Sequence, residues 1–504
     1  MFQYSIGIDI GTTNTKAILF DQHGTALQKS AVEYSILLPK PSFREMSPDT
    51  IMQAVIHVLR EVSENVDKNR ISFVSFSSMM HSLIAMDKNG KPLTNCIIWA
   101  DSRSKIYTDQ FKKKGLGLKI YNRTGAPCHP MLPLYKIMWL RDHEPEIFCK
   151  AAKFVSIKEY VFFHLFGEYV VDYSIASATG MFNLFTKTWD AEILSIIGID
   201  EARLSRVVPT KTCFHAIKKG LREKIGLASN TEYIIGASDG CLANLGAGAI
   251  KKGTLAVTIG TSGAVRACFD KPVIDVKGRV FCYILTEGKY IVGGPINNGG
   301  IAYRWFRDTF CMPEKEKAEA DGLSSYTYID RYVKQTPAGS HNLLFLPFLM
   351  GERAPYWNSN LKSAFVGITD SHTKQDFARA TIEGICYSLN SVYQIVQNLT
   401  GQIDTVFADG GLTKSKECNQ ILSDVLNTDI NVFEHTECSC LGAFLLGMNA
   451  MEKLPDLERG ADLISQRSVY HPRPENRKMY SHMFSAYIQA TNALMPVFEF
   501  LSDF

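Results

Sequence analysis

No stretch of the 504-residue sequence stays apolar over the roughly 20 residues that a membrane-spanning helix needs. The longest apolar run, Leu343 to Met350, is short and is interrupted by Pro347. The 12 cysteines include no CxxC pair, and Cys438 and Cys440 are too close together to suggest a metal site. Cysteines scattered in this way are mostly small core residues of a protein in a reducing compartment. The pattern GxxxxGK[ST] is also missing, which argues against a P-loop nucleotide site.

An excess of charge of either sign is absent too. The formal net charge is +3, which is too small to favour nucleic acid or an anionic membrane as a partner. The first expected strand begins within a few residues of Met1, which leaves no room for a signal peptide, so we expect a cytoplasmic protein. The length allows two or three domains, and the 46% hydrophobic content is ordinary for a globular protein with substantial cores.

One stretch near the start, Ile6 to Phe20, reads IGIDIGTTNTKAILF. Its alternating apolar residues predict a buried strand, a tight turn at Gly11 to Thr13, and a returning strand. The turn offers backbone N–H groups, two hydroxyls and the ammonium group of Lys16, which together suit a polyphosphate. Asp9, at the end of the first strand, could hold Mg²⁺ directly or through water.

A second copy of this stretch starts the other half of the chain. Leu255 to Phe269 reads LAVTIGTSGAVRACF and aligns without a gap, so that Gly11 meets Gly260. Two such copies predict two related domains that face one polyphosphate. Asp9 meets Thr258, so a metal that binds here should belong to the first half.

Between and after the hairpins, predicted strands and helices alternate, which is typical of a mixed α/β protein. Polar segments follow several strands, among them Met80-His81, Asp239-Gly240 and Asp409-Gly410-Gly411. Taken alone, Asp239 at a helix start is more simply a cap than a catalytic group. The glycine-rich stretch from 293 to 300 is expected to be a flexible polar segment, and a long helix is expected over 374–399.

These motifs in this order resemble the FGGY carbohydrate kinases, a family within the actin and Hsp70-like ATPase superfamily. The first phosphate motif is Asp9 to Lys16, the second is Thr258 to Gly263, and the adenosine motif is Asp409 to Ser415. Two longer patterns also fit. They are Met131-x-Pro133-x-x-Lys136-Ile137-x-Trp139-Leu140-x-Asp142-His143, and Ser363-x-Phe365-x-Gly367-Ile368 followed after seven residues by Asp376-Phe377-x-x-Ala380-Thr381-Ile382-Glu383.

The resemblance implies two related α/β domains of the actin and Hsp70 type, with a ribonuclease H-like fold and the active site in the cleft between them. The N-terminal domain is expected at 1–247, with the sugar site, and the C-terminal domain at 248–504. The expected substrates are ATP with Mg²⁺ and a small sugar or sugar acid. Kinases of this kind are commonly dimers, so a homodimer stays open.

The resemblance also assigns roles to residues. Asp239 is expected to be the general base for the sugar hydroxyl, and Asp9 the metal residue. Nucleotide contacts are expected at Gly11, Thr12, Thr13, Asn14, Lys16, Gly260, Thr261, Gly410, Gly411 and Ser415.

The sugar contacts are expected at Met80, His81, Arg103 and Asp239. Glycerol kinases have an Arg-Glu pair where this chain has Met80-His81, and xylulose kinases share the Met-His pair. The surrounding segments look most like the family members that phosphorylate gluconate, giving 6-phosphogluconate. Gluconate needs a cation for its carboxylate, and Arg103 and Arg353 are candidates, although either is equally well explained as a structural ion-pair partner.

Two alternatives remain from the sequence. A xylulose or other ketose kinase of the same family has a similar set of motifs. A non-catalytic ATPase of the actin or Hsp70 type also pairs two phosphate hairpins, but it would not need the two longer patterns or the Asp239 turn.

Overall fold

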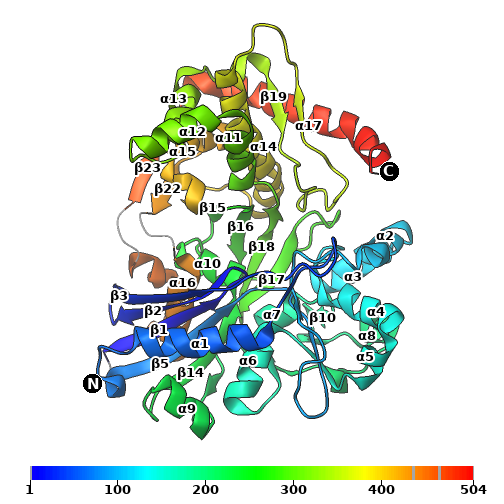
Figure 1. Ribbon diagram of the computed structural model, residues 1–504, viewed down its shortest axis with the longest axis vertical. Coiled ribbons are helices and arrows are strands. Elements are labelled where there is room, and N and C mark those ends of the chain that lie inside the picture. Colours follow the sequence, from blue (N-terminus) through cyan, green and yellow to red (C-terminus); the bar gives the residue numbers. More distant parts are fainter. Residues whose placement is uncertain (1–2, 434–436, 464–466, 503–504) are drawn as a thin grey trace. The chain divides into compact units, whose positions relative to one another are not determined.

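The computed structural model of the chain describes residues 3–433, 437–463 and 467–502 (Figure 1). The chain divides into two compact units. Unit 1 comprises Met1–Ile250, Cys268–Val292 and Glu437–Ile464, and unit 2 comprises Lys251–Ala267, Gly293–Thr436 and Ser465–Phe504. Both contain helices and sheets, so the predicted α/β class is confirmed.

Unit 1 contains the following elements. They are β1 (Tyr4–Ile10), β2 (Asn14–Asp21), β3 (Ala26–Glu33), β4 (Glu45–Met46), α1 (Pro48–Val62), β5 (Ile71–Ser78), β6 (Ile84–Met86), β7 (Cys96–Ile97), α2 (Lys105–Lys113), α3 (Leu116–Thr124), α4 (Pro133–His143), α5 (Pro145–Lys150), β8 (Lys153–Val155), α6 (Ile157–Phe166), β9 (Val170–Asp172), α7 (Tyr173–Ser177), β10 (Phe182–Asn183), β11 (Thr188–Trp189), α8 (Ala191–Ile197), β12 (Arg206–Val208), β13 (Cys213–Phe214), α9 (Lys219–Ile225), β14 (Glu232–Ser238), α10 (Asp239–Gly246), β17 (Phe281–Thr286) and α16 (Cys438–Ala450).

The main sheet of unit 1 has the strand order β13-β14-β5-β1-β2-β3. The predicted hairpin is present, because β1 pairs antiparallel with β2, and β1 also pairs in parallel with β5. Alternate β1 residues, Ile6, Ile8 and Ile10, share one buried core with α1, which runs along that face of the sheet (Figure 1). Helix α1 begins as predicted, with Ser47 accepting a hydrogen bond from the Thr50 amide.

The opposite face of β1 receives α16 at a glycine. A Cβ atom on Gly7 would lie 2.2 Å from the Cys440 carbonyl oxygen, so only glycine allows this approach. Helix α16 meets α10 in the same way, because a Cβ on Gly442 would lie 1.9 Å from the Leu242 carbonyl oxygen. These glycines let α16 pack tightly against both the first hairpin and the helix that starts at Asp239.

Unit 2 contains a smaller set of elements. They are β15 (Thr254–Ile259), α11 (Gly300–Phe310), α12 (Met312–Ala320), α13 (Thr327–Gln335), β19 (Leu344–Leu346), β20 (Ala364–Val366), α14 (Lys374–Thr400), β21 (Thr405–Asp409), α15 (Lys416–Leu426), β22 (Ile430–Phe433), β23 (Arg467–Tyr470) and α17 (Arg477–Phe500). The division between the units falls within β16 (Gly263–Phe269) and β18 (Lys289–Ile296).

The second hairpin of the sequence is also present. Strand β15 pairs antiparallel with β16 and parallel with β21, and β21 pairs in parallel with β22. The long helix predicted over 374–399 is α14, which begins with a capping box between Thr373 and Asp376. The two hairpins therefore have the same backbone arrangement, as the internal repeat predicted.

The expectation of a flexible polar segment over 293–300 was wrong. Gly293 and Gly294 lie inside the buried strand β18, and Cβ atoms on them would lie 2.1 Å from the Val265 carbonyl oxygen and 2.3 Å from the Ala354 Cβ. Gly300 begins α11 and donates its N–H to the Gly260 carbonyl. The glycines of this stretch serve close packing and not mobility.

None of the helices in the described ranges is both long enough and apolar enough to cross a bilayer.

Candidate active site

Three motifs of the first half are brought to one edge of the unit 1 sheet. The parallel strands β1, β5 and β14 are neighbours, and Ser78 of β5 lies opposite Ile10 of β1 and Ser238 of β14. The Gly11 turn, the Met80-His81 segment and Asp239 follow the ends of these strands. Ligands of α/β proteins commonly bind outside the carboxyl ends of parallel strands, so this edge is the candidate substrate site of unit 1.

Asp9 lies on β1 opposite two polar residues. The Ser77 hydroxyl donates a 2.7 Å hydrogen bond to Asp9 Oδ1, and Lys16 is the cross-strand neighbour on β2. Burial raises the pKa of Asp9, and the Ser77 hydrogen bond and the Lys16 charge oppose this rise. A half-buried carboxylate whose charged form is disfavoured by burial is well suited to an added cation, and its oxygen chemistry suits Mg²⁺.

Lys16 is engaged in an ion pair. Its Nζ lies 2.9 Å from Glu437 Oε2, and Lys29 pairs with the other oxygen of the same carboxylate. Burial alone would lower the pKa of Lys16, but the hydrogen bond and charge of Glu437 raise it above its usual value. Glu437 uses one of the three N–H donors of Lys16, so the ion pair orients the ammonium group and leaves it able to donate to a phosphate.

The first turn is fixed by hydrogen bonds. The Gly11 amide donates to the Asn14 carbonyl at 3.0 Å, and the Tyr34 hydroxyl donates to the Gly11 carbonyl at 2.7 Å. The Thr12 hydroxyl accepts a 3.0 Å bond from the Trp99 indole N–H. Thr13 is exposed at the tip of the turn. The turn is thus rigid, and Thr12 ties it to the segment that follows β7.

Asp239 is the first residue of α10 and is half-buried. Its Oδ1 accepts a 2.7 Å bond from the Gly240 amide. Two residues earlier, the Ala237 carbonyl accepts from the buried Lys158, which also bonds Asp172 Oδ2 at 2.8 Å. Burial lowers the pKa of Lys158, and the charges of Asp172 and Asp239 oppose this. Lys158 is therefore committed to Asp172 and to the end of the strand that leads to Asp239.

His81 follows β5 in an unusual backbone conformation. Its φ angle is +64°, in the left-handed region that non-glycine residues rarely adopt. The residue is 8% exposed; its ring Nδ1 lies 2.7 Å from the Ala178 carbonyl oxygen, and the ring meets the Tyr283 ring edge-on. Met80 is half-buried beside it. The structure therefore holds His81 in one orientation.

The two arginines considered for a substrate carboxylate are both already engaged. Arg103 pairs with Asp101 at 2.8 Å and with Glu45 at 2.5 Å, and its guanidinium lies 3.7 Å from the Phe43 ring centroid. Its side chain is only 5% exposed. Arg353 donates to Asn297 Oδ1 at 2.7 Å and is buried. This geometry favours the structural interpretation of each arginine over substrate binding.

In unit 2 the predicted nucleotide motifs also meet at one sheet edge. Thr258 of β15 lies opposite Asp409 of β21, so the turns after these strands are neighbours. The Gly260 carbonyl accepts from Gly300, and the Thr261 carbonyl accepts from Ile301, which fixes the second hairpin turn.

The predicted adenosine motif combines a glycine at positive φ with a helix start. Gly410 has a φ of +100°, and a Cβ on it would lie 2.6 Å from the Ile259 backbone, whereas a Cβ on Gly411 would meet nothing within 4 Å. Ser415 caps α15 by accepting from the Cys418 amide, as predicted. Gly410 is therefore needed for the fold, and Gly411 leaves open space beside the backbone.

Comparison with known proteins decides the family. The N-terminal domain model of the FGGY family of carbohydrate kinases matches residues 4–246, and the C-terminal domain model of the same family matches residues 255–451. The chain belongs to the FGGY family of carbohydrate kinases. This confirms the resemblance seen in the motifs and makes the chain a phosphotransferase, which argues against the non-catalytic ATPase.

Full-length FGGY kinases are similar to this chain in sequence. The gluconokinase of Bacillus licheniformis is 45% identical, covering 98% of this chain and 96% of the relative, and that of Bacillus subtilis (strain 168) is 44% identical, covering 100% and 98%. The xylulose kinase of the latter organism is 28% identical, covering 96% of each chain.

Two solved structures are similar to it in fold. Both are from Lactobacillus acidophilus and are 36% identical to this chain: a gluconate kinase, with a TM-score of 0.93 and 98% of each chain covered, and a ligand-bound xylulose kinase, with a TM-score of 0.94 and 99% covered.

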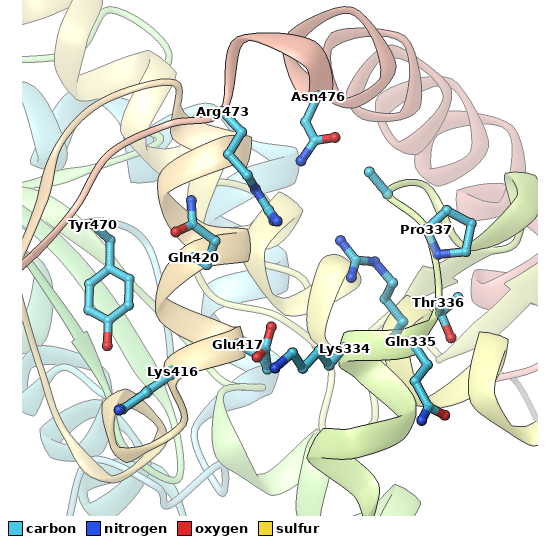
Figure 2. A pocket seen from close by; sticks show the side chains of 12 residues that line it. Lys334, Gln335, Thr336, Pro337, Lys416, Glu417, Gln420, Tyr470, Arg473 and Asn476 are labelled. Carbon is cyan, nitrogen blue, oxygen red and sulfur yellow. The ribbon is translucent and has the colours of Figure 1, made fainter.

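A cavity of this FGGY kinase that the sequence did not indicate lies in unit 2 beside α15. It has a volume of about 630 Å³ and is shown in Figure 2. Lys334 and Glu417 point toward one another across it. Two of its arginines are held by ion pairs, Arg379 with Glu383 and Arg473 with Asp424, so these parts of the wall are structural.

Sequence reasoning missed the residues that support the site. Ser77 contacts Asp9, Glu437 contacts Lys16, and Lys158 donates to the carbonyl two residues before Asp239. Nothing in the local sequence of these three residues marks them. Lys136 belongs to the first longer family pattern, and a lysine within the apolar part of that helix is the signal that could have found it. Cys213, His215 and Glu232 also converge at the edge of the sheet, where hydrogen bonds within the cluster account for their proximity.

Proposed function

We propose that this FGGY kinase transfers the γ-phosphoryl group of ATP to the terminal hydroxyl of D-gluconate, giving 6-phospho-D-gluconate and ADP. The observation that carries the proposal is the full-length similarity to two gluconokinases, which is well above the similarity to xylulose kinases. The Met80-His81 pair, which differs from the Arg-Glu pair of glycerol kinases, agrees with it.

In this proposal Asp239 is the general base. It accepts the proton of the terminal hydroxyl as that oxygen forms its bond to phosphorus and the bond to the β-phosphate oxygen breaks. The position of Asp239 after β14, next to the segment that carries His81, supports the assignment.

Asp9, with Ser77 behind it, is proposed to hold Mg²⁺ directly or through water. When bound, the ion would neutralise charge on the phosphate oxygens. The oxygen donor set and the raised pKa of Asp9 fit such an ion. Lys16, oriented by its ion pair with Glu437, is proposed to contact the polyphosphate.

The nucleotide is proposed to lie against glycine-bearing turns of both sequence halves. The amides of Gly11 to Asn14 and of Gly260 and Thr261 would donate to phosphate oxygens. Gly410 and Gly411 would let the nucleoside approach the backbone, with Ser415 at the start of α15 beside it.

For the sugar we propose contacts from Met80, His81 and Asp239. Arg103 would have to leave two carboxylates to bind a third, so we propose that it shapes the segment after Trp99 instead of binding gluconate directly.

The specific alternative is a xylulose kinase. It is favoured by one observation, that the two Lactobacillus acidophilus structures are equally similar in sequence to this chain. A coupled ADP-release assay should compare gluconate, xylulose, ribulose, fuculose and glycerol as acceptors. We expect the highest kcat/KM with gluconate. A clear preference for a ketopentose would overturn the gluconate proposal and leave the kinase assignment intact.

A further inference from the structure

Lys136 is the most unusual buried residue of unit 1. It lies in α4, is 0% exposed, and donates three hydrogen bonds, to the carbonyl oxygens of His81 at 2.6 Å, Ile98 at 2.8 Å and Ile97 at 3.2 Å. All three ammonium protons are thus used on backbone carbonyls, and not on a carboxylate. Burial lowers its pKa to about 7, and the charge of Asp101 opposes this.

Burying an ammonium group in a protein core is unfavourable, because removing it from water costs several kcal/mol. A methionine of similar length would pack there without this cost. The presence of a lysine is therefore explained by what its three acceptors need, and these acceptors belong to two separate segments.

The first segment is the one that carries His81. A φ of +64° is unfavourable for histidine, and such strain persists only where the surroundings impose it. Two contacts fix the residue: Lys136 holds its carbonyl, and the Ala178 carbonyl lies 2.7 Å from its ring Nδ1. Lys136 thus holds the backbone of His81, and the Ala178 carbonyl holds its ring.

The second segment consists of Ile97, the last residue of β7, and Ile98, which leads directly to Trp99. The Trp99 indole donates to Thr12 in the first phosphate turn. One ammonium group therefore joins the His81 segment to the segment that contacts this turn.

We propose that Lys136 is a positioning residue for the sugar site. Its ammonium group fixes the backbone of His81 relative to the segment that leads to Trp99. This inference depends on the proposed function, because it takes His81 to be a sugar contact. Lys136 itself is fully buried and acts through the segments it joins.

The first test compares Lys136→Met with a matched control. Lys153 also donates to two backbone carbonyls, those of Ala202 at 2.7 Å and Leu204 at 2.6 Å, but away from the predicted sugar contacts. In the full-length protein, Lys136→Met should lower kcat/KM for gluconate by about 10- to 100-fold while KM for ATP changes less than about 2-fold. Lys153→Met should leave both values near wild type, whatever its effect on Tm.

The second test asks whether the effect passes through His81. If it does, the effects of Lys136→Met and His81→Ala on kcat/KM for gluconate will be strongly non-additive in a double-mutant cycle. If Lys136→Met does not fold, Lys136→Gln replaces it throughout, since it keeps two N–H donors in a side chain of similar length.

Three results would overturn the inference: additive effects in the double-mutant cycle, a KM for ATP that rises as much as kcat/KM for gluconate falls, or a Lys136→Met variant with wild-type kinetics. Failure of the wild-type protein to use gluconate would instead overturn the proposed function, so the two failures are distinguishable.

Discussion

The two hairpins of this kinase have the same backbone arrangement but differ in the position of their acidic residue. In β1 the carboxylate of Asp9 faces the Ser77 hydroxyl on the parallel neighbour β5. In β15 the same position is Thr258, and the carboxylate is on the parallel neighbour β21, as Asp409. The Thr258 hydroxyl accepts a 2.7 Å bond from Arg266, so a cationic side chain already occupies its acceptor.

This difference indicates that the two copies of the predicted phosphate turn have different roles. The predicted base and metal residue, Asp239 and Asp9, both lie in unit 1. The predicted contacts of unit 2 are backbone amides, glycines and hydroxyls, at Gly260, Thr261, Gly410, Gly411 and Ser415. We infer that the acidic residues of the reaction come from unit 1, and that unit 2 contributes nucleotide contacts in addition to those proposed for the first turn.

The largest expected effect is that of Asp239→Asn in unit 1. Asparagine keeps the acceptor for the Gly240 amide, so the fold and ATP binding should be retained, but it cannot take the hydroxyl proton. Turnover should fall by about 10²- to 10⁴-fold. The coupled assay measures this loss, and calorimetric ATP binding is the control. Near-normal turnover would remove Asp239 from the mechanism.

The next effect compares the two hairpins directly. Asp9→Asn should lower turnover by about 10- to 100-fold and raise the Mg²⁺ concentration needed for half-maximal rate. Thr258→Val, at the equivalent position, should cost about 1 kcal/mol of stability through the lost Arg266 bond and leave the Mg²⁺ dependence unchanged. The same Mg²⁺ dependence in the two variants would contradict the assignment of the metal to Asp9.

Two neighbouring glycines of unit 2 separate folding from nucleotide binding. Gly410→Ala should reduce the free energy of unfolding by about 1–3 kcal/mol or more, because its Cβ meets the Ile259 backbone at a positive φ. Gly411→Ala should leave Tm near wild type and raise KM for ATP several-fold, since its Cβ points into open space. Thermal melts and ATP titrations check both, and a Gly411→Ala variant with unchanged KM would contradict the predicted contact.

The smallest expected effect is that of Ser415→Ala. Loss of the α15 cap should cost about 1 kcal/mol of stability and weaken ATP binding slightly, with no change in KM for gluconate. Urea unfolding and substrate titrations measure this. A larger weakening of gluconate binding than of ATP binding would contradict the proposed contact of Ser415 with the nucleotide.

Local sequence was enough for the two hairpins and for several helices. The hairpins were predictable because alternating apolar residues surround a Gly-Thr turn, and α1 and α15 because Ser47 and Ser415 are good caps. The order of the motifs placed the chain in its family, which the comparisons confirm.

The supporting contacts were not predictable, since they join residues far apart in the chain. Lys16 meets Glu437 across 421 positions, and Arg103 meets Glu45 across 58. The glycines at 293 and 294 read as flexible because their burial depends on β16 and Ala354, which no local pattern reveals. The three acceptors of Lys136 likewise come together only in the folded unit.

The most direct test of the account is a crystal structure of the wild-type kinase with gluconate, Mg²⁺ and a non-hydrolysable ATP analogue. The account predicts that an Asp239 carboxylate oxygen lies about 3 Å from the terminal hydroxyl of gluconate, with the metal on the Asp9 side and the nucleoside at Gly410 and Gly411. A terminal hydroxyl out of reach of Asp239, or a nucleotide bound away from both glycine–threonine turns, would contradict it.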